Sequence, residues 1–124
     1  MQVNRARRSF FLVEDEALIR MMLVDMLEEL GHAVVAEAGR IEDALRLAHD
    51  PGFDIAILDI NLGGPTSTPV AEILAKRSVP FIFASGYGED DKPEGFKNRP
   101  TLRKPFQLNG LERAIQAALA EHEN

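Results

Sequence analysis

The regular alternation of short strand-like runs with segments of helical spacing constrains this chain most. Five strand-like runs lie at residues 10–13, 33–36, 55–58, 81–84 and 101–103. Between and after them, apolar residues recur every three or four positions, as on one face of a helix. These segments are 17–30, 41–48, 68–76 and a last helix that starts near residue 108. The pattern predicts an α/β fold, with a parallel sheet covered by helices on both faces.

Local signals suggest where two of the helices begin. Thr68 and Pro69 have the form of an N-cap followed by proline at the first helical position. Asn109 and Glu112 have the spacing of a capping box, although the two residues before Asn109 can already be helical. We therefore expect the third helix to begin at Pro69 and the last near Asn109.

Composition limits the classes of function. The chain has 124 residues, no cysteine and a net charge of −6, so we expect one domain without a disulfide framework or thiolate metal site. The negative charge argues against nucleic-acid binding. No segment approaches the ~20 apolar residues of a membrane span, and the N-terminus lacks the apolar region of a signal peptide. We expect a cytoplasmic protein without membrane insertion.

Polar residues follow the predicted strands at the point where each strand ends. Glu14 and Asp15 follow the first, Asp59 the third, Ser85 the fourth and Lys104 the fifth. Each has an ordinary explanation alone, since acids favour helix starts and serine is common in turns. In an open parallel sheet, however, ligands bind beyond the carboxyl ends of the strands. The five side chains together therefore predict one site.

The chemistry of this set points to magnesium and a phosphoryl group. Mg²⁺ binds hard oxygen ligands, commonly one or two carboxylates with waters and a phosphate oxygen, and Asp15 and Asp59 can supply the carboxylates. Lys104 offers a positive charge and Ser85 a hydrogen bond to phosphate oxygens. A carboxylate can also attack phosphorus and form an aspartyl-phosphate.

These residues and their surroundings resemble the receiver domain of two-component response regulators. The stretches FFLVEDE, DIAILDINLGG, FIFASGYG and LRKPF are similar to that family's strand-end motifs, in the same order. The resemblance covers residues 9–120, leaving 1–8 and 121–124 as tails. It implies a flavodoxin-like, doubly wound sheet of five parallel strands in the order 2-1-3-4-5.

The resemblance also implies a role for each site residue. Asp59 is the expected phosphoacceptor. Asp15 is expected to bind Mg²⁺ directly, Glu14 largely through water, and Asn61 through its main-chain carbonyl. Mn²⁺ or Ca²⁺ are expected substitutes for Mg²⁺.

Further expectations concern the residues that accompany the acceptor. Lys104 is expected to pair with the acceptor carboxylate and then with the phosphate, and its bond to Pro105 is expected to be cis. Ser85 takes the place of the family's switch hydroxyl. Thr101 stands where the family usually has an aromatic switch residue, and Tyr87 is a candidate to share that task.

The segment after the fourth strand is a poor helix former. Residues 86–99 are rich in glycine, proline and charge, and the first half lacks an apolar stripe. The family's fourth helix is therefore expected to be weak or missing. FASGYG, preceded by LDINLGG and followed by KPF, is similar to the FAT GUY subgroup of receivers, with Ser85 in place of threonine.

The leading hypothesis is a single-domain switch that is not an enzyme, apart from self-catalysed dephosphorylation. A sensor histidine kinase, of the HWE or HisKA2 type, is the expected phosphodonor. The expected output is contact with a downstream protein or a histidine phosphotransferase, or draining phosphate from the kinase as a sink. We expect a monomer or weak homodimer.

Three alternatives remain at this point. A phosphohydrolase of the haloacid-dehalogenase type also uses an aspartate after a strand, but it needs a second aspartate where this chain has Asn61. A flavodoxin-like cofactor binder needs a phosphate-binding loop after the first strand, where this chain has three acids. A pseudo-receiver would have lost key residues, and all five positions are filled.

Overall fold

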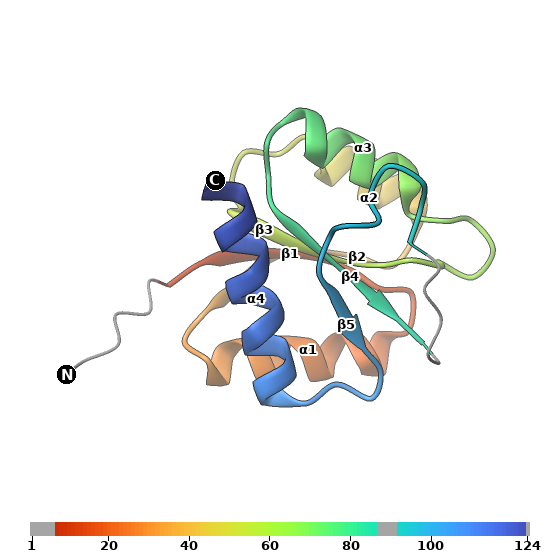
Figure 1. The fold of residues 1–124 in the computed structure, drawn as a ribbon. Helices are drawn as coiled ribbons and strands as arrows, with labels where there is room; N and C mark the ends of the chain where they lie inside the picture. The colour runs from red at the N-terminus through yellow and green to blue at the C-terminus, as the bar shows by residue number, and fades with distance from the viewer. Residues whose placement is uncertain (1–6, 87–91, 124) are drawn as a thin grey trace.

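A five-stranded parallel sheet organises the chain (Figure 1). The computed structural model describes residues 7–86 and 92–123. The strands lie side by side in the order β2-β1-β3-β4-β5, which confirms the predicted order. They are β1 (Ser9–Val13), β2 (Ala33–Ala38), β3 (Ile55–Asp59), β4 (Phe81–Ser85) and β5 (Thr101–Arg103).

Helices cover both faces of the sheet, as the alternation predicted (Figure 1). The four helices of the described residues are α1 (Ala17–Glu29), α2 (Ile41–Leu47), α3 (Thr68–Lys76) and α4 (Leu108–Glu123). Helices α1 and α4 lie on one face, and α2 and α3 lie on the other. None of these helices is long and apolar enough to span a membrane.

The strands have the alternation required by a sheet buried on both sides. In β1, Phe10 and Leu12 pack toward α1 and α4, whereas Phe11 and Val13 pack toward α2 and α3. All five residues of the central strand β3 are buried. Two apolar clusters thus hold the strands in register, and all strands end at one edge of the sheet.

The expected start of the third helix is wrong by one residue. The N-cap of α3 is Ser67, so Thr68 is already helical, and Ser67 makes no side-chain capping bond. Helix α4 begins at Leu108, which agrees with the alternative that a residue before Asn109 is already helical. Ser67 and Thr68 are both residue types that favour N-caps, and helix boundaries commonly shift by one or two residues.

The segment between β4 and β5 is not helical where it is described. Residues 92–100 form turns, with N–H groups of Phe96 and Arg99 donating to the carbonyls of Pro93 and Phe96. Phe96 lies edge-on to Phe81, with ring centroids 5.7 Å apart, and the guanidinium of Arg99 lies 4.3 Å from the Phe81 centroid. Phe96 and Arg99 thereby pack this segment against Phe81 of β4. The remaining residues of the expected helix, 87–91, lie outside the described part.

Candidate functional site

The carboxyl edge of the sheet brings the predicted polar residues together. Asp59 and Ser85 are the last residues of β3 and β4. Glu14 directly follows β1, and Lys104 directly follows β5. The register of the parallel strands aligns these ends, with Asp59 beside Ala84 and Ser85 beside Arg103.

Three carboxylates form a compact cluster at this edge. One ligand oxygen from each of Glu14, Asp15 and Asp59 lies within 4.8 Å of the others. Glu14 and Asp59 are buried, with 1% and 7% exposure, whereas Asp15 is exposed. The cluster is therefore open to solvent on the side of Asp15.

Lys104 is the cation that faces the two buried acids. Its Nζ lies 3.2 Å from Oε1 of Glu14 and 3.4 Å from Oδ2 of Asp59. The lysine offsets part of the negative charge that folding concentrates here, because attraction between charges strengthens away from bulk water.

Burial and neighbouring charges shift the pKa of Glu14, Asp59 and Lys104. Burial raises the pKa of Glu14 to about 7, and a backbone N–H bond from Glu16 opposes the shift. Burial also raises the pKa of Asp59, against the attraction of Lys104. Burial alone would lower the pKa of Lys104, but the charges of Asp59 and Glu14 outweigh it and the pKa is raised. The site thus holds more acid than its single lysine neutralises.

The donor set fits a hard divalent cation. Oε2 of Glu14 accepts a hydrogen bond from the Glu16 N–H at 3.0 Å. Oε1 of Glu14 is buried and lacks an aligned hydrogen-bond donor among the described residues, despite its ion pair with Lys104. An under-satisfied buried oxygen beside two further carboxylates suits Mg²⁺, which prefers carboxylate and water oxygens. Asp15, Asp59 and Glu14 are the side chains that would hold it.

The hydroxyl of Ser85 lies at the end of β4 and is 4% exposed. Its Oγ donates to the carbonyl oxygen of Gly86 at 3.1 Å. The hydroxyl therefore lies at the same edge of the sheet as the clustered acids.

The loop after β3 adjoins the acids. Asn61 is exposed and pairs with Thr66 in an isolated antiparallel bridge. A Cβ on Gly63 would lie 3.2 Å from Oδ2 of Asp15, which shows how closely this loop approaches the cluster. The role of the Asn61 carbonyl as a metal ligand stays a prediction.

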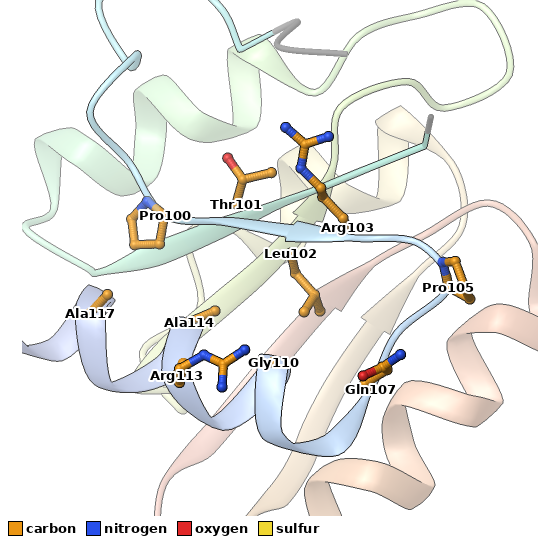
Figure 2. A pocket seen from close by; sticks show the side chains of 10 residues that line it. All are labelled: Pro100, Thr101, Leu102, Arg103, Pro105, Gln107, Gly110, Arg113, Ala114 and Ala117. Atoms are coloured by element: carbon orange, nitrogen blue, oxygen red, sulfur yellow. The ribbon is translucent and has the colours of Figure 1, made fainter. Parts of the chain in front are cut away.

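Thr101 is one of the expected switch residues that the structure describes. Thr101 lies on β5, where Figure 2 shows its side chain on the same side of the strand as Arg103 and opposite to Leu102. Its Oγ1 is buried without a hydrogen-bond partner among the described residues. Tyr87 lies outside the described residues. The peptide bond between Lys104 and Pro105 is cis.

A separate hollow of about 520 Å³ lies between β5 and α4 (Figure 2). Its lining includes Thr101, Arg103 and Arg113, and small residues of α4 such as Gly110 and Ala114. None of the clustered acids lines it, so this hollow is distinct from the strand-end site.

The fold and the strand-end site define an α/β domain with an acidic, lysine-paired centre at the carboxyl edge of its sheet. Residues 10–116 match the response regulator receiver domain, and the chain belongs to that family. The resemblance seen in the sequence is thereby confirmed. The match to this family gives no support to the phosphohydrolase alternative.

Curated relatives share the domain within longer proteins. The transcriptional regulatory protein PdtaR of Mycobacterium tuberculosis is 34% identical over 117 residues, covering 91% of this chain and 57% of the relative. The phyllosphere-induced regulator PhyR of Methylorubrum extorquens is 32% identical, covering 87% of this chain and 42% of the relative. The chain thus spans about half the length of these relatives.

Solved structures agree in fold over almost the whole chain. The solution structure of SdrG from Sphingomonas melonis Fr1 has a TM-score of 0.83 at 46% identity, covering 94% of this chain and 99% of that one. The BeF3-activated conformation of SdrG from Pseudomonas melonis Fr1 has a TM-score of 0.76 at 47% identity, covering 90% and 94%.

Proposed function

We propose that this receiver domain accepts a phosphoryl group on Asp59 and uses it as a switch. The observation that carries the proposal is the placement of Asp59 Oδ2 3.4 Å from Lys104 Nζ, inside the cluster of three acids. A buried carboxylate with a cation on one side and a metal-binding set on the other is equipped to attack phosphorus.

The transfer step needs a donor with a weak bond to phosphorus. One carboxylate oxygen of Asp59 forms the new P–O bond while the P–N bond of a phosphohistidine breaks, and the imidazole leaves with the bonding pair. Bound Mg²⁺ would neutralise charge on the phosphoryl oxygens. Lys104 supplies a second positive charge to the same oxygens, because its Nζ already lies beside the acceptor.

Ser85 is the group best placed to register the new phosphate. Its hydroxyl donates to the Gly86 carbonyl, and an aspartyl-phosphate would offer a stronger, charged acceptor. Exchange of one bond for the other would pull the end of β4 toward Asp59 and displace the segment that follows it.

Exposed apolar residues of α1 are the proposed docking place of the phosphodonor. Leu18, Met21 and Met22 are 76%, 60% and 48% exposed. Met22 also lines an apolar pocket of about 320 Å³ together with Lys104 and other residues at the strand ends. A helical donor protein, proposed to be a sensor histidine kinase of the HWE or HisKA2 type, would cover these side chains while presenting its phosphohistidine.

The cellular role is proposed on the same basis. Residues 9–120 would form the receiver unit of a single-domain, cytoplasmic regulator that acts as a monomer or weak homodimer. The almost complete coverage of the SdrG chain supports this arrangement. Signalling would occur by contact with a downstream protein or a histidine phosphotransferase, or by draining phosphate from the kinase, and the only chemistry would be loss of its own phosphate.

Chemical trapping tests the acceptor assignment. The protein is treated with acetyl phosphate and Mg²⁺, then with hydroxylamine, which converts an acyl phosphate into a hydroxamate. Peptide mass analysis should find the hydroxamate at Asp59. A modification at Asp15 or Glu14 instead would contradict the proposal.

A further inference from the structure

A single arginine joins three segments behind the acidic cluster. Arg20, on α1, donates from Nη1 to the main-chain oxygen of Glu14 at 2.5 Å. Its Nε lies 3.0 Å from Oε1 of Glu37 on β2, and its side chain is only 23% exposed. One guanidinium therefore ties α1 and β2 to the loop that carries the acids.

The carbonyl that Arg20 binds lies just past the end of β1. The N–H of Glu14 donates to the Ala38 oxygen at 3.0 Å, so β2 holds one side of this residue. Arg20 holds the other side, and a bond from a charged donor is stronger than one between neutral groups. Because the peptide group is planar, fixing the Glu14 oxygen also fixes the plane from which Asp15 extends.

Gly39 provides the room for this contact. A Cβ at position 39 would lie 3.0 Å from Arg20 Nη1 and 3.6 Å from the Glu14 oxygen. The φ of Gly39 is not in the left-handed region, unlike that of Gly31, Gly63, Gly64 or Gly95, so its conformation is open to other residues. Glycine is favoured at position 39 because a side chain there would compete with the Arg20 guanidinium for the same space.

We propose that Arg20 is a positioning residue for the metal and phosphoryl site. By holding the Glu14 carbonyl it sets the placement of the Glu14 and Asp15 carboxylates toward Mg²⁺, without touching metal or phosphate itself. This inference rests on the proposed function of the same site. Gly39 contributes to the same arrangement, because the absence of a side chain there leaves room for the Arg20 guanidinium.

The test is the dissociation constant for Mg²⁺, measured by titration calorimetry on the whole chain. Arg20→Met should weaken binding about tenfold, the low end of what loss of a group supporting metal ligands costs. Arg20→Lys should recover part of the loss, because an ammonium can still reach one carbonyl. Gly39→Ala should also weaken binding, because its Cβ displaces the guanidinium.

The double variant Arg20→Met with Gly39→Ala separates this mechanism from general damage. Without the guanidinium the added Cβ has nothing to displace, so the double variant should bind Mg²⁺ no more weakly than Arg20→Met alone. If the effect of Gly39→Ala instead adds in full, the inference is overturned.

Two controls and a stability measurement complete the design. Glu37→Gln breaks the ion pair but leaves the carbonyl bond, and Arg46→Met removes an exposed arginine paired with Asp43 on α2. Both should bind Mg²⁺ as the wild type does. Thermal unfolding without metal identifies any variant that is merely unstable. If Arg20→Met proves unstable, the Mg²⁺ affinities of Arg20→Lys and Gly39→Ala still test the inference.

The outcomes distinguish this inference from the proposed function. A wild type that binds Mg²⁺ and takes the phosphoryl group, with Arg20→Met binding Mg²⁺ equally well, would overturn the role of Arg20 alone. A wild type that neither binds Mg²⁺ nor takes the phosphoryl group would overturn the proposed function itself.

Discussion

The ammonium group of Lys104 lies 3.4 Å from Oδ2 of Asp59, although 45 positions separate the two residues in the sequence. The contact exists because β3 and β5 are parallel strands of one sheet and end at the same edge. Lys104 also forms an ion pair with Glu14, so one ammonium group contacts both buried acids.

Lys104→Met should slow phosphorylation of Asp59 by acetyl phosphate at least about tenfold, because the variant removes a cation from the developing charge on the phosphoryl oxygens. Binding of Mg²⁺ should persist, since the carboxylates remain. Initial rates of mass gain at saturating Mg²⁺ measure the effect. Lys76→Met, at an exposed end of α3, is the matched control and should react at the wild-type rate. Equal rates for both variants would contradict the role of Lys104.

Glu14→Gln should change how stability depends on pH in the metal-free protein. The pKa of Glu14 is raised from 4.5 to about 7, mainly by burial. Between these values the folded protein holds a proton that the unfolded chain has lost, so wild-type stability falls as pH rises through this window. Glutamine has no such proton. Between pH 4.5 and pH 8, the free energy of unfolding of Glu14→Gln should therefore rise relative to that of the wild type by on the order of 3 kcal/mol.

Urea unfolding in the presence of a chelator at both pH values measures this difference. Glu28→Gln, at an exposed position of α1, is the control for replacing a surface glutamate by glutamine. A stability difference between Glu14→Gln and the wild type that is the same at both pH values would contradict this prediction.

Met22→Glu should impair transfer from a kinase while leaving chemical phosphorylation intact. Met22 is 48% exposed and lines the apolar pocket beside Lys104, where a charge would oppose docking of an apolar partner. A kinase that phosphorylates the wild type should transfer to the variant at least about tenfold more slowly. Val35→Glu, at a 52% exposed apolar residue on β2, is the control. The docking proposal fails if both variants receive phosphate equally from the kinase.

Phe96→Ala should destabilise the protein by about 2 kcal/mol, because the ring is partly buried against Phe81 and Phe83. Asn98→Ala, at an exposed position in the same segment, should change stability little. Denaturant unfolding compares the two. Equal stability would mean that the turn segment adds nothing to the core.

The order of strands and helices could be read from the sequence because apolar periodicity reflects burial directly. The strand-end residues were also predictable, since each follows an apolar run. Phe96 was missed because its burial depends on contacts with Phe81 and Phe83, which no local pattern reveals. Arg20 was missed for a similar reason: an arginine on an amphipathic helix is normally solvated, and only the fold brings it to the Glu14 carbonyl.

The helix caps show a different limit. Ser67 and Thr68 are both residue types that favour N-caps, so the sequence alone does not choose between them. The burial of Glu14 was likewise not readable, because acids after a strand are usually solvated. Its contacts with Lys104 and with the Glu16 N–H, which only the fold brings about, offset part of the cost of that burial.

The central claim is that Asp59 accepts the phosphoryl group, and intact mass tests it most directly. Wild type, Asp59→Asn and Asp43→Asn are incubated with acetyl phosphate, with and without Mg²⁺. We predict a gain of one phosphoryl group in the wild type and in Asp43→Asn, only with Mg²⁺, and none in Asp59→Asn. A Mg²⁺-dependent gain in Asp59→Asn equal to that of the wild type would contradict the account.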